Sequence, residues 1–117
     1  MTGHAAHVRE ATPADRDFLV DCASAMALET EHKELDLPTL RAGVAALLDD
    51  ATRGRVFVAE VGGAPAATLM LTYEWSDWRN GMFWWIQSVY VRPEFRRRGI
   101  YKAMYAHARE LAAVRGG

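Results

Sequence analysis

The segment between residues 55 and 91 constrains the fold most, because its hydrophobic pattern is that of strands joined by tight turns. Arg55 to Val61 is apolar and β-branched, and Gly62-Gly63 follows as a hairpin signal. The apolar segment Pro65 to Trp75 comes next, then a second turn signal at Asn80-Gly81 and the segment Met82 to Val91. Tight turns of this kind join neighbouring strands. The pattern predicts three consecutive strands, and the last, apolar on both faces, is expected to be central in its sheet.

Helical patterns flank these strands. In Thr12 to Glu29, Thr12 can cap a helix, Pro13 suits its first turn, and Phe18, Cys22 and Met26 recur every four residues. A short strand over Ala6 to Ala11 precedes this helix. Two further helices are expected, one after residue 38 and one from about residue 99, with apolar faces formed by Leu40, Val44, Leu47 and Leu48, and by Ile100, Met104, Ala108 and Leu111. The order β-α-α-β-β-β-α predicts a mixed α/β fold.

Composition narrows the class of protein. A chain of 117 residues, half of them hydrophobic, predicts a single domain over residues 1–117 and excludes a disordered polymer. No apolar run reaches the roughly 20 residues of a membrane span, and the start lacks the apolar centre of a signal peptide. The single Cys22 cannot form an internal disulfide and is expected to be a buried helix residue rather than a nucleophile. These features predict a soluble, cytoplasmic protein with no membrane partner.

Positive charge is concentrated near the carboxyl end. Residues 92–117 carry seven basic and two acidic side chains, whereas residues 1–91 carry seven basic and thirteen acidic ones. A local excess of this kind favours a local anionic ligand over a long polyanion. The acidic remainder, with no second basic or aromatic-stacking face, argues against nucleic acid as a partner.

The basic segment follows a strand and opens a helix. A buried strand that ends at Val91, a short loop and a helix that begins at Gly99 would place the first unpaired backbone N–H groups of the helix at the carboxyl end of the strand. Gly99 allows the backbone to approach a ligand, and Arg96 to Arg98 can add charge-assisted hydrogen bonds. The alternative is that these arginines form a solvated basic loop. Their position at the end of a central strand favours a phosphate site.

The segment VYVRPEFRRRGIYKAMYAHA, Val89 to Ala108, resembles the acetyl-CoA binding motif of the Gcn5-related N-acetyltransferase (GNAT) superfamily. Arg96 matches the leading Arg or Gln of the motif, Gly99 its central Gly, and Pro93 and Phe95 its approach. The order of elements also matches, so the resemblance covers nearly the whole chain and implies the GNAT acyltransferase fold. Tyr101 departs from the motif, because the family usually has Gly or Ala there.

The resemblance implies acetyl-CoA as the acyl donor and direct attack of a small-molecule amine on the thioester. It implies that the pantetheine arm lies along Val89 and Val91, with a backbone N–H near Val89 that stabilises the oxyanion. The pyrophosphate would bind at the turn, which comprises Arg96, Arg97, Arg98, Gly99, Tyr101 and Lys102.

Candidates for the residues that transfer protons in the reaction come from outside the binding motif. Family members often have Glu or Asp where this chain has Gln87 and Ser88, neither of which is a base at neutral pH. The segment between the first two helices often forms the acceptor pocket of the family, and Glu29 and Glu31 there are the first choices for catalysis and for binding the acceptor. His32 lies beside them. Each carboxylate can also be read as a solvated surface charge.

A second cluster combines tryptophans with carboxylates. Trp75 and Trp78, flanked by Glu74 and Asp77, are expected to line the pocket for the acceptor. The alternative for the aromatic residues is core packing plus a dimer contact, which is favoured for Trp84 and Trp85. No spacing typical of metal ligands appears, so no metal is expected.

The family pattern continues beyond the last helix of this sequence, with a fifth strand and a further helix that commonly supplies a tyrosine as general acid. The domain is therefore expected to be incomplete at its carboxyl terminus, although completion by a partner chain and a naturally short protein stay open. The alternative function is a non-catalytic acyl-CoA-binding or dimerisation module. Without a fifth strand, the edge from Trp84 to Val91 is expected to pair with a second copy as a homodimer, or with a missing carboxyl-terminal segment.

Overall fold

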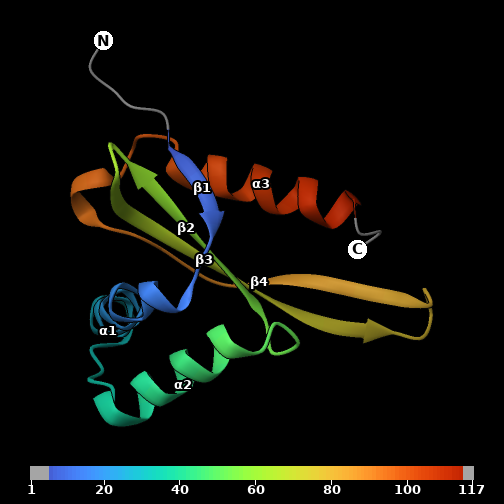
Figure 1. Ribbon diagram of the computed structural model, residues 1–117, viewed down its shortest axis with the longest axis horizontal. Coiled ribbons are helices and arrows are strands. Elements are labelled where there is room, and N and C mark those ends of the chain that lie inside the picture. The colour runs from blue at the N-terminus through green and yellow to red at the C-terminus, as the bar shows by residue number, and fades with distance from the viewer. Residues whose placement is uncertain (1–5, 115–117) are drawn as a thin grey trace.

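A four-stranded antiparallel sheet in the order β1-β2-β3-β4 forms the centre of the computed structural model, which describes residues 6–114 (Figure 1). The strands are β1 (His7–Glu10), β2 (Arg55–Val61), β3 (Ala64–Ser76) and β4 (Gly81–Val91). The helices are α1 (Arg16–Glu31), α2 (Leu37–Asp49) and α3 (Ile100–Val114), with short 3₁₀ turns η1 (Pro13–Asp15) and η2 (Pro93–Phe95). This confirms the predicted order of elements and the mixed α/β class. None of the helices in the described part has the length and hydropathy needed to cross a membrane.

Helices cover both faces of the sheet, α1 and α2 on one side and α3 on the other (Figure 1). Alternation along β2 divides the core accordingly, since Val56 and Val58 pack with α1 and α2 whereas Phe57 and Ala59 pack with α3. The predicted helix faces are confirmed, because the buried residues include Cys22, Val44, Ile100, Met104 and Ala108. Burial raises the pKa of the Cys22 thiol to about 11, so this side chain is a protonated core residue at neutral pH.

Strand β4 contains a bulge at Gln87. Met70 on β3 pairs with Ser88, but the next residue, Leu71, pairs with Ile86, so Gln87 is an extra residue on β4. Side chains two apart on a regular strand share a face, yet Trp84 packs in the core beside α3 and Tyr90 packs in the core beside α1. The bulge therefore exchanges the two faces of β4 halfway along its length.

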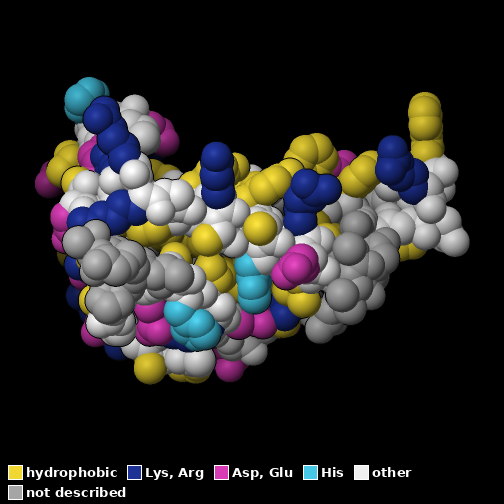
Figure 2. All heavy atoms as spheres, turned by 90° about the horizontal axis from the view of Figure 1, so that it is seen from above, with side chains coloured by type: hydrophobic (Ala, Val, Ile, Leu, Met, Phe, Trp, Pro, Cys, Tyr) yellow, Lys and Arg dark blue, Asp and Glu magenta, His cyan; other side chains and the backbone are white. Residues whose placement is uncertain are grey.

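The prediction of a central strand from the apolar pattern is wrong for the described residues, because β4 lies at the edge of the sheet and pairs with β3 alone. The edge position agrees with the expectation drawn from the lack of a fifth strand. The tip of the β3–β4 hairpin projects beyond the helices (Figure 1). Figure 2 shows hydrophobic side chains at that end of the molecule, and the exposed ones on β4 are Met82, Phe83, Trp85 and Ile86.

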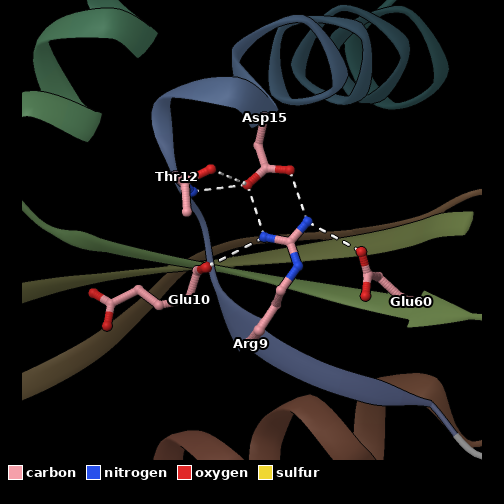
Figure 3. A network of polar contacts seen from close by, with 5 residues as sticks. All are labelled: Arg9, Glu10, Thr12, Asp15 and Glu60. Atoms are coloured by element: carbon pink, nitrogen blue, oxygen red, sulfur yellow. Dashed lines mark hydrogen bonds and ion pairs between the residues drawn. The ribbon is translucent and has the colours of Figure 1, made fainter. Parts of the chain in front are cut away.

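A polar network fixes the start of α1 against the sheet (Figure 3). The Asp15 carboxylate receives two hydrogen bonds of 2.8 Å from the Arg9 guanidinium and one of 2.7 Å from the backbone N–H of Thr12. Arg9 also lies 3.2 Å from the carboxylate of Glu60 on β2. The hydrogen bonds from Arg9 hold the pKa of Asp15 below its usual range. Thr12 stands at the predicted helix start, and the network joins β1, η1 and β2.

A candidate anion site at the end of strand β4

The chain leaves β4 through a short, well-anchored connection. The backbone N–H of Arg92 donates to the carbonyl of Ala66 on β3 at 2.9 Å. Pro93 then opens the 3₁₀ turn η2, in which the N–H of Phe95 donates to the carbonyl of Arg92 at 2.9 Å. Phe95 packs against the core on the α3 side, and Ile100, at the start of α3, is buried. These two apolar anchors place the intervening residues 96–99 at the surface between β4 and α3.

Two left-handed residues shape this turn. Arg97 has a φ of 66° and Gly99 a φ of 74°. The left-handed region suits glycine and is uncommon for arginine, so the backbone is bent sharply on both sides of Arg98. A Cβ atom built on Gly99 would meet no atom within 4 Å, so the space in front of this residue is open.

The first turn of α3 directs free amide groups toward this space. The first intrahelical bond runs from the N–H of Ala103 to the carbonyl of Gly99 at 3.1 Å, so the amides of residues 100–102 precede it. Arg96, Arg97, Arg98 and Gly99 are all exposed at the surface. Helix N-termini carry partial positive charge, and the nearby guanidinium groups add to it. The arrangement forms a candidate site for an anion of phosphate type, at the position that the sequence predicts.

The backbone of β4 offers a second row of polar groups. Because the amide of Arg92 points toward β3, strand alternation directs the backbone groups of Val91 and Val89 away from β3, to the outer edge of the sheet. The carbonyl of Val91 does point outward, since it accepts a hydrogen bond from Nε of Arg96 at 2.8 Å. An extended ligand along this edge would meet backbone donors and acceptors that lead to the phosphate turn.

Glu29, near the C-terminal end of α1, contacts this turn although it is distant from it in the sequence. Its Oε1 atom accepts a hydrogen bond from Arg96 at 2.9 Å, and its Oε2 atom accepts one from the Tyr90 hydroxyl at 2.5 Å. These hydrogen bonds, first that from Tyr90 and then that from Arg96, lower the pKa of Glu29. Burial and the bond to Glu29 raise the pKa of Tyr90 to about 12. The sequence suggested both Glu29 and Arg96 as site residues, but not their contact and not the part played by Tyr90.

The predicted acceptor residue Glu31 and the predicted cofactor residues Tyr101 and Lys102 are exposed. Glu31 is the last residue of α1, and His32, with a left-handed φ of 51°, ends the helix. Tyr101 and Lys102 lie exposed in the first turn of α3, where Tyr101 stacks near Tyr105 with ring centres 6.2 Å apart. The side chain of Tyr101 therefore turns along the helix surface toward Tyr105.

The structure does not bring the predicted tryptophan cluster to this site. Trp75 and Trp78 are 57% and 95% exposed and belong to the outer end of the β3–β4 hairpin, which extends away from α1 (Figure 1). Glu74 accepts a hydrogen bond of 2.8 Å from the indole of Trp85, so that carboxylate is engaged within the hairpin. The carboxylates of α1 and the tryptophans of the hairpin form two separate regions.

An apolar cavity of about 80 Å³ lies on the α1 and α2 side of the sheet. Its walls come from both helices and from β2, β3 and β4, and its polar side chains are those of Thr68, Ser88 and Tyr90. Ser88 and Tyr90 flank Val89 on β4, so the cavity reaches the part of the strand whose backbone faces the outer edge. No cluster of three or more potential metal ligands occurs among residues 6–114.

Comparisons with known proteins agree with this geometry. The model of the acetyltransferase (GNAT) family matches residues 19–117. A Caenorhabditis elegans protein named thialysine N-epsilon-acetyltransferase is 33% identical over 60 residues, a match that covers 51% of this chain and only 37% of that protein.

Solved structures show the same fold. A structure described as a possible acetyltransferase from Clostridium difficile 630 is 44% identical, with a TM-score of 0.87, over 92% of this chain and 71% of that one. An integron cassette protein from the Cole Harbour salt marsh metagenome is 24% identical, with a TM-score of 0.86, over 93% of this chain and 71% of that one, and shows the fold alone. The family match, the fold and the phosphate-type turn agree, and the chain belongs to the acetyltransferase (GNAT) family.

Proposed function

We propose that the protein is an N-acetyltransferase that uses acetyl-CoA and acts on the amine of a small molecule. The observation that carries this proposal is the turn of residues 96–99, in which two left-handed residues open the N-terminus of α3 at the end of β4. Family membership supports acetyl transfer in general, and the geometry of the turn supports a phosphate-bearing donor.

In this proposal the pyrophosphate of acetyl-CoA accepts hydrogen bonds from backbone amides in the turn and in the first helical turn. The donors would be the amides of Arg97, Arg98, Gly99, Tyr101 and Lys102, with the charge of the arginines in support. The pantetheine arm would follow the outward-facing backbone of Val89 and Val91. The N–H of Val89 would then bind the oxyanion, a contribution of about 3 kcal/mol per donor in other enzymes.

The chemistry requires two proton transfers. The amine nitrogen loses a proton and forms a bond with the thioester carbonyl carbon, and collapse of the tetrahedral intermediate then breaks the C–S bond, after which the thiolate gains a proton. Glu31, exposed at the end of α1, is the proposed base for the amine. Glu29 lies on the same side, although hydrogen bonds already occupy both of its oxygen atoms. The apolar cavity beside Ser88 and Tyr90 would receive the apolar part of the acceptor.

Calorimetry with acetyl-CoA, followed by a thiol-release assay with a panel of small amines, tests the proposal. We expect binding of acetyl-CoA and release of CoA with at least one amine of the panel. Binding without turnover of any amine would favour the alternative of a non-catalytic acyl-CoA-binding module. Absence of binding heat at several temperatures would contradict both readings, because each requires the phosphate turn to be occupied.

We also propose that the outer edge of β4 on the hairpin side of the bulge, from Trp84 to Ile86, pairs with a strand of a second copy, which leaves the backbone of Val89 and Val91 for the pantetheine arm. Among the described residues β4 is hydrogen-bonded on one side only, and Trp85 and Ile86 are exposed on it. Long apolar edges associate in water. Sedimentation velocity should show a dimer at roughly tens of micromolar, the range in which exposed edges already associate. A stable monomer at that concentration would contradict the pairing without affecting the proposed chemistry.

A further inference from the structure

Glu29 joins helix α1 to a region that lies more than 60 positions later in the sequence. Its carboxylate binds Arg96, which begins the phosphate turn, and Tyr90, which lies on β4. Arg96 is held at two further points, because its Nε donates to the carbonyl of Val91 at 2.8 Å and its guanidinium lies 5.4 Å from the centre of the Tyr90 ring. One arginine thus links the C-terminal part of α1, the end of β4 and the start of the turn.

The protonation states of this cluster do not suit a proton relay. The pKa of Glu29 is lowered by its two donors, and the pKa of Tyr90 is raised to about 12. A carboxylate with a lowered pKa is a weaker base, and a phenol with a raised pKa is a weaker acid. At neutral pH the cluster is therefore a stable arrangement of an anion, a cation and a neutral hydroxyl.

The position of the cluster indicates what it holds. Arg96 directly precedes Arg97, whose left-handed backbone is unfavourable for a residue with a side chain. Such a conformation persists only where the flanking residues are fixed. The buried side chain of Ile100 fixes the turn on its helical side, and the contacts of Arg96 fix it on the strand side.

We infer that Glu29 is a positioning residue, which holds Arg96 and thereby keeps the phosphate turn in the conformation that receives the pyrophosphate of acetyl-CoA. The inference rests on the proposed function for its ligand, but its structural part concerns the free protein. The side chains of Arg96 and Glu29 are 44% and 40% exposed, so their ion pair contributes little to the stability of the whole fold. Its effect is expected to be local to the turn.

Hydrogen exchange in the ligand-free protein tests the structural part. Glu29→Gln should accelerate amide exchange in the peptide covering residues 93–102 by about tenfold, with unchanged exchange in β2 and β3. Asp21→Asn is the matched control, because Asp21 is an exposed carboxylate on the same helix and its replacement changes the net charge equally. Equal exchange in the wild type and in Glu29→Gln would overturn the inference. If Glu29→Gln fails to fold, Tyr90→Phe, which removes one donor to Glu29, should give a smaller acceleration confined to the same peptide.

Calorimetry and kinetics separate positioning from catalysis. Glu29→Gln should weaken acetyl-CoA binding about fivefold, and its combination with Arg96→Gln should be no weaker than Arg96→Gln alone, because the two side chains act through one contact. The pH profile of turnover should keep its shape. A fall in kcat with unchanged acetyl-CoA affinity and loss of the acidic limb of the profile would instead make Glu29 a base. If the wild type shows no binding of acetyl-CoA, the proposed function fails, and the exchange experiment still decides whether Glu29 holds the turn.

Discussion

Substituting glutamate for Gly99 should weaken acetyl-CoA binding by at least about 100-fold, which corresponds to about 2.7 kcal/mol, while the fold is retained. Gly99 has a φ of 74°, and a Cβ atom at this position would meet no atom within 4 Å. The substitution therefore costs the fold only the strain of a left-handed residue, about 1 to 2 kcal/mol. Its carboxylate, however, would stand where the pyrophosphate is proposed to bind, so like charges would meet at the amides of α3.

Gly63→Glu provides a matched control for this substitution. Gly63, in the turn between β2 and β3, has a φ of 83°, and a Cβ atom there also meets no atom within 4 Å. The two variants carry the same added charge and a comparable backbone strain, so they should lose similar amounts of thermal stability. Calorimetry should show that Gly63→Glu binds acetyl-CoA as the wild type does. If Gly99→Glu also binds normally, the turn of residues 96–99 is not the phosphate site.

Replacing Asp15 by asparagine should lower the free energy of unfolding by about 2 to 4 kcal/mol at neutral pH. The side chain of Asp15 is 11% exposed and pairs with Arg9 through two hydrogen bonds of 2.8 Å. An amide in its place offers one acceptor oxygen and no charge, so Arg9 would keep a partly buried positive charge with fewer partners. Urea unfolding monitored by tryptophan fluorescence measures the change. Asp17→Asn is the control, because Asp17 is an exposed carboxylate nearby whose loss should change the stability by less than about 1 kcal/mol.

The contribution of Asp15 to the free energy of unfolding should decrease as the pH falls. The pKa of Asp15 is lower in the folded chain than its unfolded value of about 3.9, so its contribution is fully present above that value. The contribution is lost as the pH falls through the folded pKa, where the carboxylate is protonated in both states. The difference between the wild type and Asp15→Asn should therefore be largest at about pH 7 and shrink below about pH 4. A difference that stays constant down to about pH 2 would show that the carboxylate charge is not its source.

Local signals in the sequence were sufficient for the elements and their buried faces. The strand Arg55–Val61 was predicted with its observed bounds, because β-branched residues end at a pair of glycines. The buried face of α3 followed from the spacing of Ile100, Met104 and Ala108. The exposed turn before α3 also follows from local order, since a strand, a short loop and a glycine before a helix place the first amides of the helix together, and phosphate binding there stays a prediction.

Features that depend on distant residues were not predictable in this way. The bond between Tyr90 and Glu29 joins residues that are 61 positions apart, and no local pattern marks it. The expected role of Trp75 and Trp78 beside the acceptor rested on their place at a strand end and in a loop, next to carboxylates. The projection of the hairpin beyond the helices decides where they lie, and no local pattern marks it. For β4 the local pattern pointed to a central position, because apolar residues on both faces are typical of a central strand and also of this projecting hairpin. Only the order of elements, compared with that of the GNAT family, indicated an edge strand.

The bulge at Gln87 has a consequence for insertions and deletions in relatives of this chain. Removal of that one residue would restore a regular pairing, so the segments on its two sides would no longer present opposite faces. In one outcome, the aromatic side chains at the tip of the hairpin would move to the opposite face of the sheet. In the other, Ser88 and Tyr90 would move away from the α1 side, and Glu29 would lose its hydrogen bond with the Tyr90 hydroxyl. Insertions or deletions in the loop between Ser76 and Gly81 do not require a change in strand pairing, so the side chains of β4 keep their faces. Natural variation in the length of this hairpin is therefore expected to collect at its tip, and a relative that lacks a residue at position 87 is expected to differ also at positions 29 and 90.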